Sequence, residues 1–177
     1  YPTQWVKPRL KVSFENITNH IYFDNQGLPQ QHAGNIQVLA ADLQLNITTP
    51  WVNLDNSIVY QHSSSEYIPL PALTLYNNLY YHGTWVKALD VQIGVDMRLF
   101  TKYYAPVLNP ALGQFCVQQV EKVGNYPVMN VYANFYVKHI RLKLFAQYQH
   151  FNASFMNKQY FAMPGYPMAP DMFRAGL

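Results

Sequence analysis

The sequence lacks any long apolar run. Half of its 177 residues are hydrophobic, yet no stretch reaches the roughly 18 consecutive apolar residues that a transmembrane helix requires. Charged residues make up 12% of the chain, about half of the usual share, whereas aromatic residues make up 16%. This composition is unusual for a soluble domain, and no segment qualifies as a membrane-spanning helix.

Cysteine and clustered charge are also scarce. The single cysteine, Cys116, rules out an internal disulfide framework, and we expect it to be a small strand residue. The net charge of +3 is not gathered into a run, so the chain lacks the basic footprint of a nucleic-acid-binding protein.

Catalytic motifs are missing as well. The six histidines show no HExxH or other metal-ligand spacing. There is no GxSxG motif, no glycine-rich phosphate loop and no plausible cysteine–histidine pair. We therefore predict that the protein is not an enzyme and that it uses no metal and no cofactor.

The strongest pattern present is the alternation over residues 89–99. Period two is the period of a β-strand, whose successive side chains point to opposite sides of the sheet. A soluble strand usually has about 5–6 residues, whereas a tilted strand needs about 9–11 to cross a bilayer. The pattern predicts one strand of a transmembrane β-barrel, with an apolar, lipid-facing set and a polar, lumen-facing set. The lipid-facing set is Leu89, Val91, Ile93, Val95, Met97 and Leu99, and the lumen-facing set includes Asp90, Gln92, Asp96 and Arg98.

A second polar set lies near residue 145. Arg141, Lys143, Gln147 and Gln149 alternate with an apolar set that includes Leu142 and Leu144. An Arg or Lys that faces lipid near mid-membrane costs roughly 2–4 kcal/mol, so we expect these polar side chains to face the lumen. Two interpretations stay open: a charged pore lining that tunes selectivity, or ion pairs that fill a narrow or plugged barrel.

Aromatic residues recur near the predicted strand ends. Tyr and Trp favour the membrane–water interface because their rings are apolar at one end and polar at the other. We interpret these residues as aromatic girdles. The candidates are Trp51, Tyr80, Tyr81, Trp85, Tyr103, Tyr104 and Tyr148.

The whole chain, residues 1–177, is interpreted as a single all-β domain, an antiparallel transmembrane β-barrel. The pattern predicts eight strands, at residues 12–23, 36–47, 51–61, 72–81, 85–100, 114–122, 128–151 and 173–177. A slip of parity predicts a β-bulge near Ala41, and residues 128–151 are interpreted as one bulged strand, because Lys138 and His139 are not typical turn residues.

The connections between these strands alternate between long and short. Outer-membrane barrels have short periplasmic turns and longer extracellular loops, which predicts this alternation. The last long loop runs from residue 152 to 171. For its methionine-rich, aromatic part, Phe155 to Met172, three interpretations are open: a binding surface, a constriction folded inward, or a surface loop packed on its own prolines and aromatics, which we favour.

The C-terminal third resembles a known family. Residues 103–115 (YYAPVLNPALGQF), 125–152 and 160–177 (YFAMPGYPMAPDMFRAGL) are similar to the putative porin family of outer-membrane β-barrels from the Bacteroides group, and the PGYP element followed by Phe-Arg is the most specific part. SFENITNHIYFDNQGLPQQ and LDNSIVYQHSSS upstream also resemble that family. The resemblance implies that the chain is the C-terminal portion, of about eight strands, of a larger barrel, with its last strand truncated.

The resemblance implies passive diffusion of small solutes through a polar lumen, in the outer membrane of a Gram-negative cell. The partners expected are the outer-membrane bilayer and possible envelope proteins or lipoproteins, and no nucleic acid. The alternative is a sealed structural barrel that docks other envelope proteins through its long extracellular loops. A soluble all-β sandwich is a third and weaker interpretation.

Overall fold

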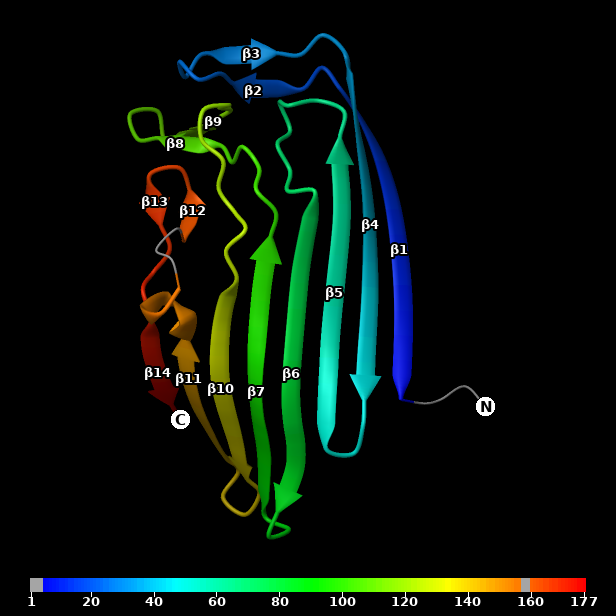
Figure 1. The fold of residues 1–177 in the computed structure, drawn as a ribbon, viewed down its shortest axis with the longest axis vertical. Helices are drawn as coiled ribbons and strands as arrows, with labels where there is room; N and C mark the ends of the chain where they lie inside the picture. The colour runs from blue at the N-terminus through cyan, green and yellow to red at the C-terminus, as the bar shows by residue number, and fades with distance from the viewer. Residues whose placement is uncertain (1–4, 157–159) are drawn as a thin grey trace.

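The main sheet of the protein has eight antiparallel strands (Figure 1). The structure is a computed structural model and describes residues 5–156 and 160–177. In spatial order the strands are β1 (Val6–Thr18), β4 (Asn35–Thr48), β5 (Val52–Ser63), β6 (Leu73–Trp85), β7 (Leu89–Phe100), β10 (Val128–Val137), β11 (Leu142–Gln149) and β14 (Met172–Gly176). The prediction of an all-β antiparallel fold is confirmed. Within the described ranges the sheet is open, since no strand joins β1 to β14.

The connections sort by length onto the two ends of the sheet (Figure 1). The short-turn end carries the turns at residues 49–51, 86–88 and 138–141. The long-loop end carries the other connections, which contain a four-stranded sheet ordered β3 (Pro29–Gln31), β2 (Ile21–Phe23), β9 (Gln114–Cys116) and β8 (Val107–Asn109). The last connection contains the 3-10 helix η1 (Phe151–Ser154) and the hairpin of β12 (Phe161–Met163) and β13 (Tyr166–Pro167). The predicted alternation of long and short connections is confirmed.

Two predicted strands are wrong, although the main sheet still has eight strands, because one predicted strand is absent from it and another is two strands. Residues 114–122 do not enter the main sheet, because only Gln114–Cys116 is extended and it pairs within the loop sheet. Residues 128–151 form a hairpin, β10 and β11, rather than one bulged strand. The turn at 138–141 has neither glycine nor proline, and Arg141 takes the left-handed conformation with φ of 52°. Such a turn leaves no typical turn signal in the sequence.

Two smaller predictions are also wrong. The pairing of β4 with β1 runs without a register shift from Asn35 to Thr48, so there is no bulge near Ala41. The turn placed at residues 82–84 lies inside β6, and the chain reverses at 86–88 instead. There Val86 and Lys87 have φ of 49° and 57°, which non-glycine residues seldom adopt.

The main sheet is a single layer. Globular domains bury the apolar side of a sheet against a second layer, but the buried apolar residues here lie mostly in the loops at the long-loop end, including Ala105, Cys116, Val123 and Tyr126. Cys116 is a buried residue of β9, as expected of a small strand residue. Across residues 5–156 and 160–177, no helix is long and apolar enough to span a membrane.

Candidate functional site

One face of the main sheet, here called the apolar face, is almost continuously hydrophobic. The residues that alternate along β7, from Leu89 to Leu99, pair across the strands mostly with apolar residues of β6 and β10, and the polar exception is Asn77, the partner of Met97. Leu142 and Leu144 of β11 lie on the same face, because they pair with Val137 and Phe135. All the predicted lipid-facing residues therefore share one face. Large residues exposed on it are Val6, Leu10, Val12, Phe14, Leu39, Leu43, Val52, Ile58, Tyr60, Leu79, Ile93, Val95, Val131, Tyr148 and Phe173.

Val91 differs from the rest of this set. It lies on the apolar face, but its side chain is 0% exposed, whereas Val95 is 41% exposed. Its cross-strand neighbours are Gly83 and Phe135. The hydroxyl of Tyr81 lies over Gly83 and occupies the space that a Cβ atom would take. Val91 is therefore covered by the side chains of neighbouring residues and is not itself part of the exposed apolar surface.

The opposite face, here called the polar face, collects the predicted lumen-facing residues. Asp90, Gln92, Asp96 and Arg98 lie on it along β7, and Lys143, Gln147 and Gln149 lie on it along β11. Arg141 was predicted to lie on the same face. It belongs instead to the turn between β10 and β11, so that prediction is wrong. The lumen that this face would line stays a prediction.

Hydrogen bonds between strands hold the polar face. The Asn130 amide donates to Oδ1 of Asp96 at 2.8 Å, and the Asp96 side chain is 8% exposed. The Tyr132 hydroxyl donates to Asn78 at 2.9 Å, and the Asn134 amide donates to Gln92 at 3.2 Å. Each of these bonds joins β10 to β7 or crosses from β10 to β6. The polar side chains are thus paired between strands rather than independently solvated.

A second acceptor network lies on β4 and β5. Asp42 accepts hydrogen bonds from the Gln44 amide at 3.0 Å and the Ser57 hydroxyl at 3.1 Å. At the short-turn end, Asp90 forms an ion pair of 2.9 Å with Lys138. The carboxylates in the middle of the polar face are therefore engaged by their neighbours.

A row of cations on β1 was missed by sequence reasoning. Lys7, Arg9 and Lys11 alternate along this edge strand, on the polar face and exposed. The predicted strand began at residue 12, although the period-two pattern extends through Pro8 and Leu10 on the other face. Proline is accepted in an edge strand, where one row of N–H groups has no partner in the sheet. The alternation of Lys and Arg with apolar residues was the available signal.

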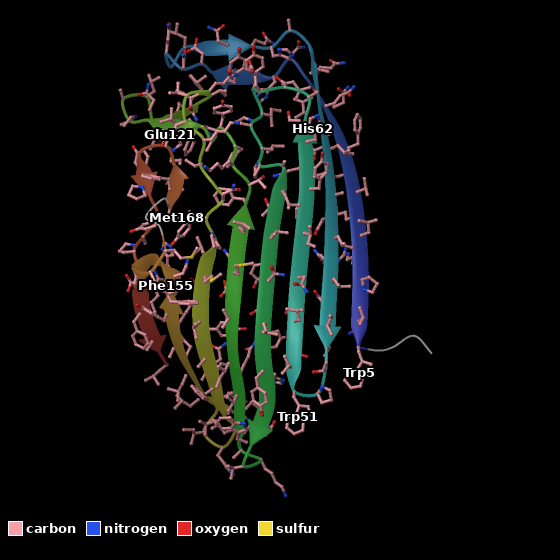
Figure 2. All side chains as sticks on the ribbon, viewed as in Figure 1. Trp5, Trp51, His62, Glu121, Phe155 and Met168 are labelled. Carbon is pink, nitrogen blue, oxygen red and sulfur yellow. The ribbon has the colours of Figure 1, made fainter. Side chains whose placement is uncertain are left out.

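The girdle candidates separate into two groups. At the short-turn end, Trp51 lies in a turn and is 71% exposed (Figure 2), and the indole of Trp85 donates to the Tyr81 hydroxyl at 3.0 Å. Trp5, which sequence reasoning left out, lies at the same end (Figure 2). Tyr80 lies on the polar face, so it does not share a surface with Tyr81.

The other candidates lie at the long-loop end. Tyr103 forms an isolated bridge with Val123, and the Lys122 ammonium stands 4.6 Å from the centre of the Tyr104 ring. The Tyr148 hydroxyl donates to Asp171 of the last long loop at 2.5 Å. The aromatic residues thus occur at both ends of the strands, and their contact with a membrane interface stays a prediction.

The last long loop is anchored by a buried polar cluster. Asn152 is 0% exposed; its amide donates to the Pro127 carbonyl at 2.7 Å, and its Oδ1 accepts from the Met129 N–H at 3.0 Å. The ring of His150 contacts the Tyr126 hydroxyl at 2.9 Å and the Ala169 carbonyl at 2.7 Å. Burial raises the pKa of the Tyr126 phenol, which keeps the hydroxyl neutral. The start of this loop is therefore fixed to the segment before β10.

The described residues can also be compared with the requirements of a metal site. In the part of the chain that the structure describes, no group of three or more His, Cys, Asp or Glu side chains could hold a metal ion. The geometry instead offers a long sheet with one apolar and one polar face, and a separate layer of loops at one end.

Comparison with known families identifies the chain. The family model described as "Putative porin" matches residues 1–177, the whole chain. The protein belongs to the putative porin family. The resemblance of the C-terminal third to this family is confirmed, while its bacterial group and its position in a larger barrel stay predictions. No curated protein and no solved structure matches the chain.

Proposed function

We propose that this member of the putative porin family forms part of an outer-membrane β-barrel, through which small solutes diffuse across a polar lumen. The observation that carries the proposal is a single-layer sheet with one apolar face and one polar face. Monomeric soluble proteins rarely expose apolar patches beyond a few hundred Å², and larger ones mark interfaces with membranes or proteins. Here one whole face, from Leu10 on β1 to Phe173 on β14, carries exposed apolar side chains.

The strand lengths support a membrane as the partner of the apolar face. A tilted strand needs about 9–11 residues to span a bilayer, and the strands from β1 to β7 in the main sheet have 12 to 14 residues. A hydrocarbon layer would cover their apolar face without a second protein layer. The polar face would then line an aqueous lumen. There the positive charges of Lys7, Arg9 and Lys11 would influence which solutes pass, according to their charge.

The loops support an alternative proposal, a sealed barrel that docks other envelope proteins. The four-stranded loop sheet at the long-loop end is an ordered surface rather than a set of short turns (Figure 1). Such a layer is a plausible platform for a partner, and it also stands where it would narrow an opening. No turnover and no cofactor are part of either proposal.

Conductance distinguishes the two proposals. The full-length protein, purified in detergent, is reconstituted in planar bilayers, and single-channel currents are recorded in KCl. Diffusion through a lumen predicts discrete conductance steps, whereas a sealed barrel predicts none. Extraction of the protein from outer membranes by detergent but not by salt or urea tests the membrane location separately.

A further inference from the structure

A hollow of about 620 Å³ lies on the polar face near the long-loop end. The residues that line it include Ser57 of β5, Tyr76 of β6, Arg98 and Phe100 of β7, Val128 at the start of β10, and Met168 of the last long loop. Its volume lies in the range of roughly 300–1,000 Å³ that is typical of small-molecule sites. We call it the Arg98 hollow.

Arg98 supplies the charge of this hollow. Its guanidinium carbon stands 5.5 Å from the centre of the Tyr76 ring, an attractive contact that helps to fix its position. Within the described ranges the one ion pair below 4.0 Å joins Lys138 to Asp90, so Arg98 has no carboxylate in direct contact. Asp96, two residues away, accepts instead from Asn130 at 2.8 Å. The N–H donors of Arg98 therefore remain available to a ligand.

The backbone at Met168 and at the next residue is fixed by polar contacts. The Met168 N–H donates to the Tyr160 carbonyl at 2.8 Å, and the carbonyl oxygen of the next residue, Ala169, lies 2.7 Å from Nδ1 of the buried His150. Figure 2 shows Met168 in the segment that leads back from the β12–β13 hairpin. Met168 therefore lines the same hollow as residues of β5, β6, β7 and β10.

The chemistry of the lining defines the ligand. Arg98 is the one fully charged group in it, and an arginine fork matches a carboxylate with two parallel hydrogen bonds. The other walls at Phe100, Val128 and Met168 are apolar, and methionine adapts to ligands of irregular shape. We propose that the Arg98 hollow binds a small carboxylate with an apolar body, such as an aromatic acid. This inference rests on the proposed function, because a lumen would bring the solute to this face.

Ligand binding is tested on the full-length protein in detergent by fluorine NMR, with 4-fluorobenzoate as the probe. The expected result is saturable line broadening that acetate displaces poorly and benzoate displaces well. Arg98→Gln is expected to weaken binding by about tenfold or more, since charge-assisted hydrogen bonds are lost. Arg98→Lys, which keeps the charge but loses the fork, is expected to lie in between.

The matched control is Arg174→Gln, which removes the same charge from the polar face of β14, outside the hollow. It is expected to bind like the unaltered protein, and Met168→Ala is expected to weaken benzoate binding without changing acetate binding. Equal effects of the two arginine substitutions, or equal binding of acetate and benzoate, would overturn the proposal.

The same proteins are then examined in planar bilayers. Conductance that benzoate blocks only when Arg98 is present supports both the site and the porin function. A protein without conductance that still binds 4-fluorobenzoate through Arg98 would overturn diffusion through a lumen and leave the site standing.

Discussion

The apolar and polar faces of the main sheet share one backbone but differ in how their side chains are held. On the apolar face, side chains such as Leu79 and Val95 are 52% and 41% exposed and make no directional contacts. On the polar face, a hydrogen bond ties Asp96 to the neighbouring strand β10, and another ties Tyr132 of β10 to β6 across β7. This difference shows that the stability of the apolar face depends on the medium that covers it, whereas the stability of the polar face depends on particular hydrogen-bond partners. Substitutions should therefore be judged by hydrophobicity on the first face and by lost partners on the second.

The largest expected effect comes from a charge on the apolar face. Val95→Arg should lower the free energy of unfolding in lipid vesicles by about 2–4 kcal/mol, because Val95 is exposed near the middle of β7 on the face proposed to meet lipid. The matched change on the polar face, Gln92→Arg, should cost less, about 1 kcal/mol, since only two long hydrogen bonds are at stake, with Asn134 at 3.2 Å and Tyr132 at 3.5 Å. Urea titrations monitored by tryptophan fluorescence give both values. Equal costs would remove the distinction between the faces.

Gly94 tests packing on the polar face. A Cβ atom there would stand 2.7 Å from the Tyr132 ring and 2.7 Å from the Cβ of Tyr80. Gly94→Val should therefore destabilise the protein by about 1–3 kcal/mol through overpacking. The double variant Gly94→Val/Tyr132→Ala should lose less stability than the sum of the two single variants in the same titration. Simple additivity would show that the tyrosine ring does not press on this glycine.

Asn56 and Asn77 sharpen the comparison, because they are polar residues in the middle of the apolar face. The Asn77 amide donates to the Asn56 side chain, and the Asn56 amide donates to the Leu45 carbonyl at 3.1 Å. Asn77→Leu alone should cost about 1 kcal/mol, since Asn56 loses its donor. Replacing both with leucine should be close to neutral in lipid, and equilibrium unfolding of the three variants measures this. A double variant as unstable as the single one would argue that this face is not surrounded by hydrocarbon.

The smallest expected effect lies at the rim of the polar face. Asp90→Asn removes the ion pair with Lys138, whose side chain is 44% exposed. Exposed pairs contribute about 0.2–1 kcal/mol, so the loss should stay within that range. It should also be smaller in about 1 M salt, where the screening length of about 3 Å is close to the 2.9 Å separation of the pair. Unfolding measured at low and high salt checks the prediction, and a loss that is the same at both salt concentrations would contradict it.

Sequence patterns predicted the two faces because period two is a local property. The alternation over residues 89–99 placed Val95 and Asp96 on opposite faces without any knowledge of neighbouring strands. The turns were harder, since Val86, Lys87 and Arg141 adopt positive φ without the glycine or asparagine that usually marks it. The two β10–β11 strands were therefore joined into one. The basic row on β1 was lost because Pro8 argues against a strand except at a sheet edge.

The candidate site was also predictable only in part, because local spacing gives the face of a strand but not the contacts between distant segments. The polar set on β7 was accessible from its spacing, but its assembly with Tyr76, Val128 and Met168 was not. Met168 lies 70 residues beyond Arg98 in the chain, and no local pattern predicts that the two line one hollow. The buried anchor is similar, since Asn152 contacts Tyr126 and Pro127 across a hairpin whose turn was not recognised.

The open margin of the main sheet at β1 sets a condition on any barrel built from it. β1 has 13 residues, and among the described residues it has no neighbour on its outer side. Backbone N–H and C=O groups left without partners in hydrocarbon cost several kcal/mol each. The unpaired backbone groups along β1 would therefore need a strand of matching length beside them in a membrane.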